Sequence, residues 1–203
     1  MILGAPDATY SLDKAAEIAE IYAMEAQDGH NETKSIKELL RLCREYLKKK
    51  ITISYLNRPY VPGGSIRGYC IAYADRYQIC LFSGQNRCWR RFVLCKELFH
   101  VILDEDRYRT MDVYGHVEEY MNKIYVPAMA GPGAVSEALA ELAAMEFMFP
   151  HKRRVEIAAQ NPPIDSLTTA KRFLVPQNFV EVYMIPAFIG QLKPYMDRMK
   201  KQA

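Results

Sequence analysis

The sequence predicts an α+β fold in which a small three-stranded antiparallel sheet packs on one strongly apolar helix. Three observations favour this class. Apolar residues recur at helical spacing within the first 50 residues, three short β-type runs follow them, and helical patterns dominate the final third of the chain. We divide the chain into N-terminal helices (1–50), a core (51–150) and a helical C-terminal region (151–203), and we expect one compact unit.

Two helices are predicted before the sheet. The first covers Ser11 to Gln27, with Ser11 as its N-cap, and the second covers Thr33 to Lys50. Residues with strong β-propensity and intervening turn signals then predict three consecutive strands. These strands are expected at Ile51–Leu56, Ile66–Ala74 and Tyr77–Phe82.

The remaining chain is predicted to be mainly helical. A helix runs through Phe92 to Asp104, and another covers Val135 to Phe149 and stops at Pro150. Between them, Arg107 to Gly133 is expected to be rich in loops. Asp165 to Met184 predicts two short helices around Val175 and Pro176, and a final helix runs toward Lys201.

Composition and charge narrow the class of protein. Of 203 residues, 50% are hydrophobic and 25% charged, and 27 basic against 24 acidic residues give a net charge of +3. This balance argues against nucleic-acid binding driven by bulk charge. The five cysteines show no paired CxxC spacing, and no signal peptide or membrane-spanning run is recognisable, so we expect a reduced, cytoplasmic protein with buried thiols. His30, His116 and His151 are expected at the surface.

The helix through Phe92 to Asp104 carries the most informative pattern. At about 100° per residue, Lys96, Glu97, His100 and Asp104 share one face, and apolar residues occupy the rest. A helix this apolar should be buried, so its ionisable stripe must be paired, metal-bound or open to a cleft. The simpler alternative is an amphipathic helix whose polar stripe faces water.

The same stripe is one residue short of the zinc-peptidase motif His-Glu-x-x-His. In that motif two histidines four residues apart bind Zn²⁺, and the glutamate activates a metal-bound water. Here Glu97 and His100 are present, and Lys96 stands in place of the first histidine. Function therefore depends on whether this change removes the metal.

Three segments give the chain a family resemblance. Residues 91–100 (RFVLCKELFH) resemble the motif helix of the ImmA/IrrE family of zinc metallopeptidases, and residues 137–150 (EALAELAAMEFMFP) resemble its second helix. Residues 169–184 are similar to a downstream helical element of that family. The resemblance extends from about Ile51 onward and implies a zincin-like fold. The chain departs from the family pattern at Cys95, Lys96, Phe99, Glu141 and Tyr183.

The resemblance also implies roles for individual residues. His100 matches the second histidine ligand, Glu137 the carboxylate ligand and Glu97 the general base. Asp104 shares the face of His100 and is a candidate replacement ligand or hydrogen-bond partner of that histidine. Taken alone, Glu137 would be an acidic residue in the first turn of a helix, stabilised by the helix dipole.

Lys96 is the position on which the functional hypotheses divide. An ammonium group has three donors and no lone pair, and its ordinary pKa is about 10.4, so lysine is a poor zinc ligand. Its charge could instead replace the metal by pairing with Glu97, Glu137 or Asp104. In the alternative, Lys96 extends to solvent from the edge of a cleft.

Three functions follow. The first is a peptidase-like regulatory protein with an impaired site, where zinc is weakly bound or absent, that binds a protein partner such as a helix-turn-helix repressor. The second is an active zinc peptidase with a substituted ligand set that cleaves such a repressor. The third is a DNA-associated regulator that uses a helix-turn-helix at 165–184, although residues 178–184 have little basic character for direct nucleic-acid contact. No membrane association is expected.

Overall fold

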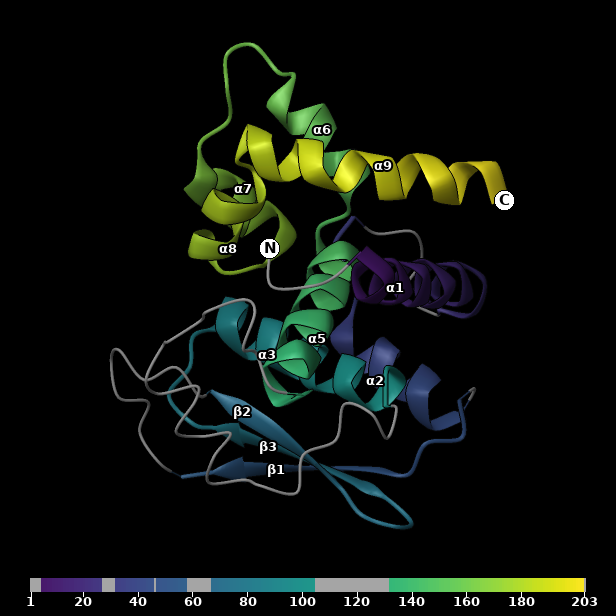
Figure 1. Cartoon of the computed structure of the whole chain (residues 1–203). Coiled ribbons are helices and arrows are strands. Elements are labelled where there is room, and N and C mark those ends of the chain that lie inside the picture. Colours follow the sequence, from purple (N-terminus) through teal and green to yellow (C-terminus); the bar gives the residue numbers. More distant parts are fainter. Residues whose placement is uncertain (1–4, 27–31, 46, 58–66, 105–131, 203) are drawn as a thin grey trace.

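The computed structural model describes residues 5–26, 32–45, 47–57, 67–104 and 132–202. Within these ranges the chain forms eight helices and one three-stranded sheet, which confirms the predicted α+β class (Figure 1). In the described part of the chain, no helix is both long and apolar enough to cross a membrane. Most of the predicted loop between Arg107 and Gly133 lies outside the described residues, as do His30 and His116.

The sheet differs from the prediction in how its strands pair. Strands β1 (Ile51–Leu56), β2 (Gly68–Ala72) and β3 (Tyr77–Phe82) lie in the order β1-β3-β2. β2 and β3 are antiparallel, as predicted, but β1 and β3 are parallel. The chain passes from β1 to the far edge of the sheet and returns through the β2–β3 hairpin, so β3 enters the centre in the direction of β1. The sheet is therefore mixed, and the expectation of a wholly antiparallel sheet is wrong.

One face of the sheet packs on α3 (Arg87–Ile102), the predicted motif helix. Asn86 caps this helix, because its side chain accepts a hydrogen bond from the backbone N–H of Trp89. On the facing side, a Cβ built on Gly68 would lie 2.7 Å from Val93 Cγ1 and 2.9 Å from the Cys80 carbonyl oxygen. The missing side chain of Gly68 thus lets β2 approach α3 closely.

Helix α5 (Pro132–Met148) lies at the centre of the molecule, between α3 and α1 (Ala5–Glu25) (Figure 1). Its fully buried alanines, among them Ala140 and Ala144, present little bulk, which suits close packing of helices on both sides. The predicted N-cap role of Ser11 is wrong, because α1 starts six residues earlier. Ser11 is fully buried inside the helix, and its hydroxyl donates to the Leu139 carbonyl at 2.7 Å.

Helix α2 (Ile36–Glu45) is shorter than predicted and joins α1 to the sheet. Its apolar face includes Leu39 and Cys43, which are fully buried against the core. Near its C-terminal end, the Arg44 guanidinium donates two hydrogen bonds to the carbonyl of Ile51, the first residue of β1. This contact fixes the edge strand against the helix.

Four helices form the C-terminal third. The two short helices predicted around Val175 and Pro176 are confirmed as α7 (Ser166–Phe173) and α8 (Gln177–Tyr183), and the final helix is α9 (Pro186–Gln202). Helix α6 (His151–Ala158) was not predicted. His151 is only 8% exposed, and its Nε2 lies 3.1 Å from the Ile189 carbonyl oxygen, so its expected surface position is wrong. Figure 1 shows these helices stacked above α1, α3 and α5.

Candidate functional site

Helix α3 carries the predicted ionisable stripe into the interior of the molecule. The side chain of Lys96 is 13% exposed and that of Glu97 only 1%. Elsewhere on the helix, Leu98 and Phe99 are fully buried, and Phe99 contacts Phe147 of α5 at a ring-centroid distance of 5.8 Å. The apolar residues of the helix are therefore anchored in the core, and Lys96 and His100 face α5 instead of solvent.

Lys96 lies between two carboxylates. Its ammonium donates to Oε2 of Glu137 on α5 at 2.5 Å and lies 3.2 Å from Oε1 of Glu97. The contact with Glu97 is close enough for an ion pair but is not aligned as a hydrogen bond. Lys96 thus points into the site, and the alternative in which it extends to solvent does not describe this structure.

His100 completes the group. Its Nε2 lies 3.1 Å from Oε1 of Glu137, and its Nδ1 lies 3.2 Å from the hydroxyl of Ser136. Glu137 therefore contacts Lys96 through Oε2 and His100 through Oε1. We call Lys96, Glu97, His100 and Glu137 the Lys96 cluster.

Glu137 is held as a carboxylate despite its burial. Burial alone would raise its pKa, but the charge of Lys96, the proximity of His100 and the hydrogen bond from Lys96 hold the pKa well below its ordinary value. The surroundings of Glu137 thus favour its ionised form. A protonated Glu137 would lose the charge that balances Lys96.

Glu97 and Asp104 occupy different environments. Neither carboxylate oxygen of Glu97 has an aligned hydrogen bond within the described structure, so Lys96 is its nearest charge partner. Asp104 lies just beyond the end of α3, where its Oδ2 accepts a hydrogen bond from the Tyr77 hydroxyl at 2.5 Å. The structure thus brings Lys96, Glu97, His100 and Glu137 together. Asp104 instead forms a hydrogen bond with Tyr77 of β3.

These residues do not fit a zinc ion. An ammonium without a lone pair contacts the carboxylate that would have to bind the metal, and its positive charge would repel a cation there. Within the described ranges, no group of three or more His, Cys, Asp or Glu side chains is arranged to hold a metal ion.

The thiols near the site are poor nucleophiles. Cys95, next to Lys96 in sequence, is fully buried and faces the core, and burial raises its pKa. Cys70 of β2 lies near Glu97, and burial, followed by the charges of Glu97 and Asp104, raises its pKa as well. Both thiols remain protonated at neutral pH, as expected of structural cysteines.

A second polar pair adjoins the cluster and was not found by sequence reasoning. Glu141 lies one turn after Glu137 on α5, close enough to Tyr183 of α8 for each group to affect the pKa of the other. Burial raises the pKa of Glu141 to about 7, although Lys96 and Tyr183 act to lower it. The sequence contained one hint of this pair, because both positions depart from the ImmA/IrrE pattern that the chain resembles.

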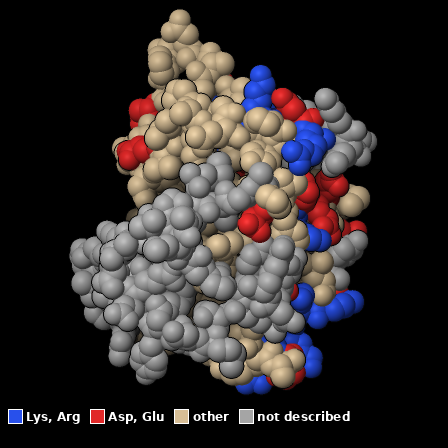
Figure 2. Space-filling model, in the orientation of Figure 1, with Lys and Arg blue, Asp and Glu red and all other residues tan. Residues whose placement is uncertain are grey.

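Helices α7 and α8 have the spacing of a helix-turn-helix but not its charge pattern. The exposed side chains of α8 are Gln177, Asn178, Glu181 and Val182, so this surface carries an acidic group and no basic one. Figure 2 shows Lys and Arg side chains interspersed with Asp and Glu on the visible described surface, without a continuous basic patch. Phosphate contacts depend mainly on basic side chains, so this surface does not favour DNA binding.

The sequence was also compared with models of known protein families and with curated proteins, and neither comparison finds a match.

Proposed function

We propose that this protein is a peptidase-like regulatory protein that binds a protein partner and does not hydrolyse it. In this proposal the chain shares the architecture of the ImmA/IrrE peptidases, and the ammonium of Lys96 takes the place of the metal ion. The single observation that supports it most strongly is the position of Lys96 Nζ, 2.5 Å from Glu137 and 3.2 Å from Glu97.

Electrostatics explains why a lysine can preserve such a fold. Without a cation, Glu97 and Glu137 would repel each other in a poorly hydrated interior. One ammonium between them neutralises much of that repulsion and keeps α3 and α5 in register. The same ammonium has no lone pair to bind a metal and activate water, so the cluster stabilises the fold without supplying a hydrolytic nucleophile.

The nature of the partner follows from the resemblance alone. Members of the ImmA/IrrE family commonly act beside helix-turn-helix repressors, so we propose a repressor-type protein as the partner. The lack of basic side chains on the exposed face of α8 supports a protein partner over direct contact with DNA.

The experiment mixes the purified protein with a candidate repressor, with and without added Zn²⁺. We expect a complex by size-exclusion chromatography and an intact repressor by mass spectrometry under both conditions. A repressor cut in the presence of Zn²⁺, and left uncut by the Glu97→Gln variant, would instead establish the active-peptidase alternative. If none of the helix-turn-helix repressors tested forms a complex, the proposed partner class is wrong.

A further inference from the structure

We propose that the end of α8 and the exposed side of α9 bind a second copy of this chain, with the two α9 helices antiparallel. The uncharged part of this surface is formed by five exposed residues: Val182, Ile185, Pro186, Ala187 and Gly190. Glu181 and Lys193 flank it, and we call the whole set the α8–α9 surface. The surface contains no residue of the Lys96 cluster, so this inference goes beyond the proposed function and does not depend on it.

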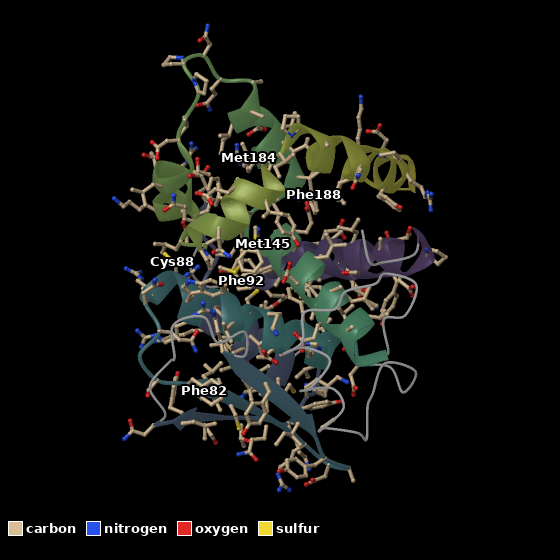
Figure 3. All side chains as sticks on the ribbon, turned by 60° about the vertical axis from the view of Figure 1, so that its left-hand side comes forward. Phe82, Cys88, Phe92, Met145, Met184 and Phe188 are labelled. Atoms are coloured by element: carbon tan, nitrogen blue, oxygen red, sulfur yellow. The ribbon has the colours of Figure 1, made fainter. Side chains whose placement is uncertain are left out.

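Two large apolar side chains project from this surface. Val182 is 47% exposed and Ile185 is 49% exposed. The bend between them is anchored by Tyr183, which is 4% exposed and whose ring centroid lies 4.5 Å from that of Phe188. Met184 and Phe188 are themselves packed against the core at this bend (Figure 3). Because these neighbours hold the backbone, Val182 and Ile185 remain exposed, and adjacent exposed apolar groups often mark an interaction surface.

The sequence along the surface lacks charge. Charged residues make up 25% of the chain, yet none occurs between Glu181 and Lys193. Figure 2 shows a broad uncharged area over the upper part of the molecule, where Figure 1 places α8 and the start of α9. A partner recognised mainly through charge would not bind here. An apolar partner surface bordered by a few charges would fit.

Helix α9 turns its apolar side toward the body of the molecule and leaves the other side open. Leu192 is fully buried, and Phe188, Tyr195 and Met196 pack against the core at helical spacing. Gly190 lies on the exposed side, where a Cβ would meet nothing within 4 Å. The fold itself therefore does not require glycine at this position, although glycine weakens a helix. A second helix can approach closely here, because no side chain of Gly190 stands between the two.

The charges at the two ends of the surface favour a second copy as the occupant. Glu181 Oε1 accepts hydrogen bonds from Gln177 and Ser166, but Glu181 has no ion pair within the described residues. Lys193 is exposed and likewise has no ion pair in that part of the chain. Residues 181 and 193 are equally far from Ala187 in sequence, so an antiparallel pair centred there brings Glu181 of each copy toward Lys193 of the other. Two-fold symmetry then forms this ion pair twice.

The size of the surface sets the strength of the complex. A stable dimer commonly buries about 800 Å² on each partner, contributed by roughly 20 to 30 residues. The α8–α9 surface has fewer residues than this, so we expect a weak dimer in equilibrium with its monomer. Further along α9, the exposed Asp197 and Arg198 carry opposite charges and add no net charge to the interface.

Sedimentation velocity of the protein, from micromolar to submillimolar concentration, measures this equilibrium. We expect the parent to change from monomer to dimer as its concentration rises. Gly190→Gln places a long side chain on the surface and favours the helix, so it should weaken dimerisation by about tenfold or more without unfolding the protein. Arg76→Gln, an exposed change on the turn between β2 and β3, is the control and should leave the equilibrium unchanged.

Charge reversal tests the proposed ion pair. Glu181→Lys and Lys193→Glu should each weaken dimerisation by about tenfold at low salt, because each sets like charges against one another twice. The double variant restores opposite charges and should recover dimerisation close to that of the parent. A variant that had merely misfolded would not be rescued by a second charge change.

The proposal is overturned if the parent remains monomeric at every concentration, or if its dimer persists unchanged in Gly190→Gln. Failure of the double charge variant to recover dimerisation would overturn it as well. A parent that stays monomeric by itself, but forms a repressor complex that Gly190→Gln abolishes, would assign the surface to that protein partner instead of a second copy.

Discussion

Lys96 lies between the two carboxylates of the site, Glu97 and Glu137. It was predicted from helical periodicity that Lys96, Glu97 and His100 share a face. In the structure, Lys96 and His100 both contact Glu137 of α5, and Glu97 lies beside Lys96. Glu137 could be assigned to the same site only through the family resemblance, because it lies 41 residues from Lys96 in sequence. The proximity of Glu141 to Tyr183 was not predicted, since no local pattern links α5 to α8 and the only hint was that both positions depart from the pattern that the chain resembles.

Lys96→Ala should destabilise the fold by roughly 3 to 5 kcal/mol, because it leaves buried carboxylates without their cation. Chemical denaturation of the two proteins measures the difference. Lys14→Ala is the matched control: it breaks a lysine–glutamate pair in which both side chains are more than a third exposed, and it should cost no more than about 1 kcal/mol. Similar small losses in both variants would mean that Lys96 contributes no more than a surface pair.

Glu137 should make the fold sensitive to acid. Its pKa in the folded protein is lowered, so its contribution to the free energy of unfolding is present above the ordinary pKa of 4.5 and is lost as pH falls below it. The loss should approach about 1.4 kcal/mol per pH unit within that interval. Denaturation series of the parent and Glu137→Gln should show a steeper acid decline in the parent. Parallel curves would contradict the assigned ionisation.

At the scale of helices and strands, local patterns predicted most elements but not their arrangement. The three strands were predicted near their observed positions, whereas their order was not, because a one-dimensional pattern does not record that β3 inserts between β1 and β2. Helix α6 was missed because its sequence, HKRRVEIA, is dominated by charge. One of those charges, Arg154, is fully buried against Glu146, a pairing that depends on the tertiary fold.

Gly68→Ala should test the close approach of β2 to α3. The added methyl group would meet Val93 and the backbone of Cys80, so we expect destabilisation by about 1 to 3 kcal/mol. Gly190→Ala in α9 is the matched control, because the same methyl group there has no neighbour within 4 Å. Alanine favours a helix, so this second variant should gain up to about 1 kcal/mol, as measured by thermal melts. Equal effects of the two changes would argue against a tight β2–α3 contact.

Across the whole molecule, the C-terminal helices are joined to the rest by two kinds of contact. The rings of Phe149 and Phe173 lie 4.5 Å apart, and Phe173 is 1% exposed. At the surface, Arg172 forms a bidentate ion pair with Glu32. Its Nε donates to Oε2 at 2.7 Å and its Nη2 donates to Oε1 at 2.8 Å. Buried aromatic contacts outweigh exposed ion pairs in most proteins, so the apolar contact should dominate.

Phe173→Ala should therefore cost roughly 3 to 5 kcal/mol, while Arg172→Ala should cost less than about 1 kcal/mol. Urea denaturation followed by circular dichroism gives both values. Neighbouring substitutions on one short helix make a close comparison, since they differ mainly in which side of α7 they change. A larger loss in Arg172→Ala would show that charge, and not aromatic packing, holds the C-terminal helices.

The central claim is that the ammonium of Lys96 takes the place of a metal ion, and calorimetric titration with Zn²⁺ tests it most directly. The parent protein should show no saturable binding, whereas Lys96→His should restore a lone pair beside His100 and Glu137 and bind zinc. His100→Ala in the Lys96→His background should abolish that binding. Stoichiometric zinc in the parent, lost on His100→Ala alone, would contradict the claim.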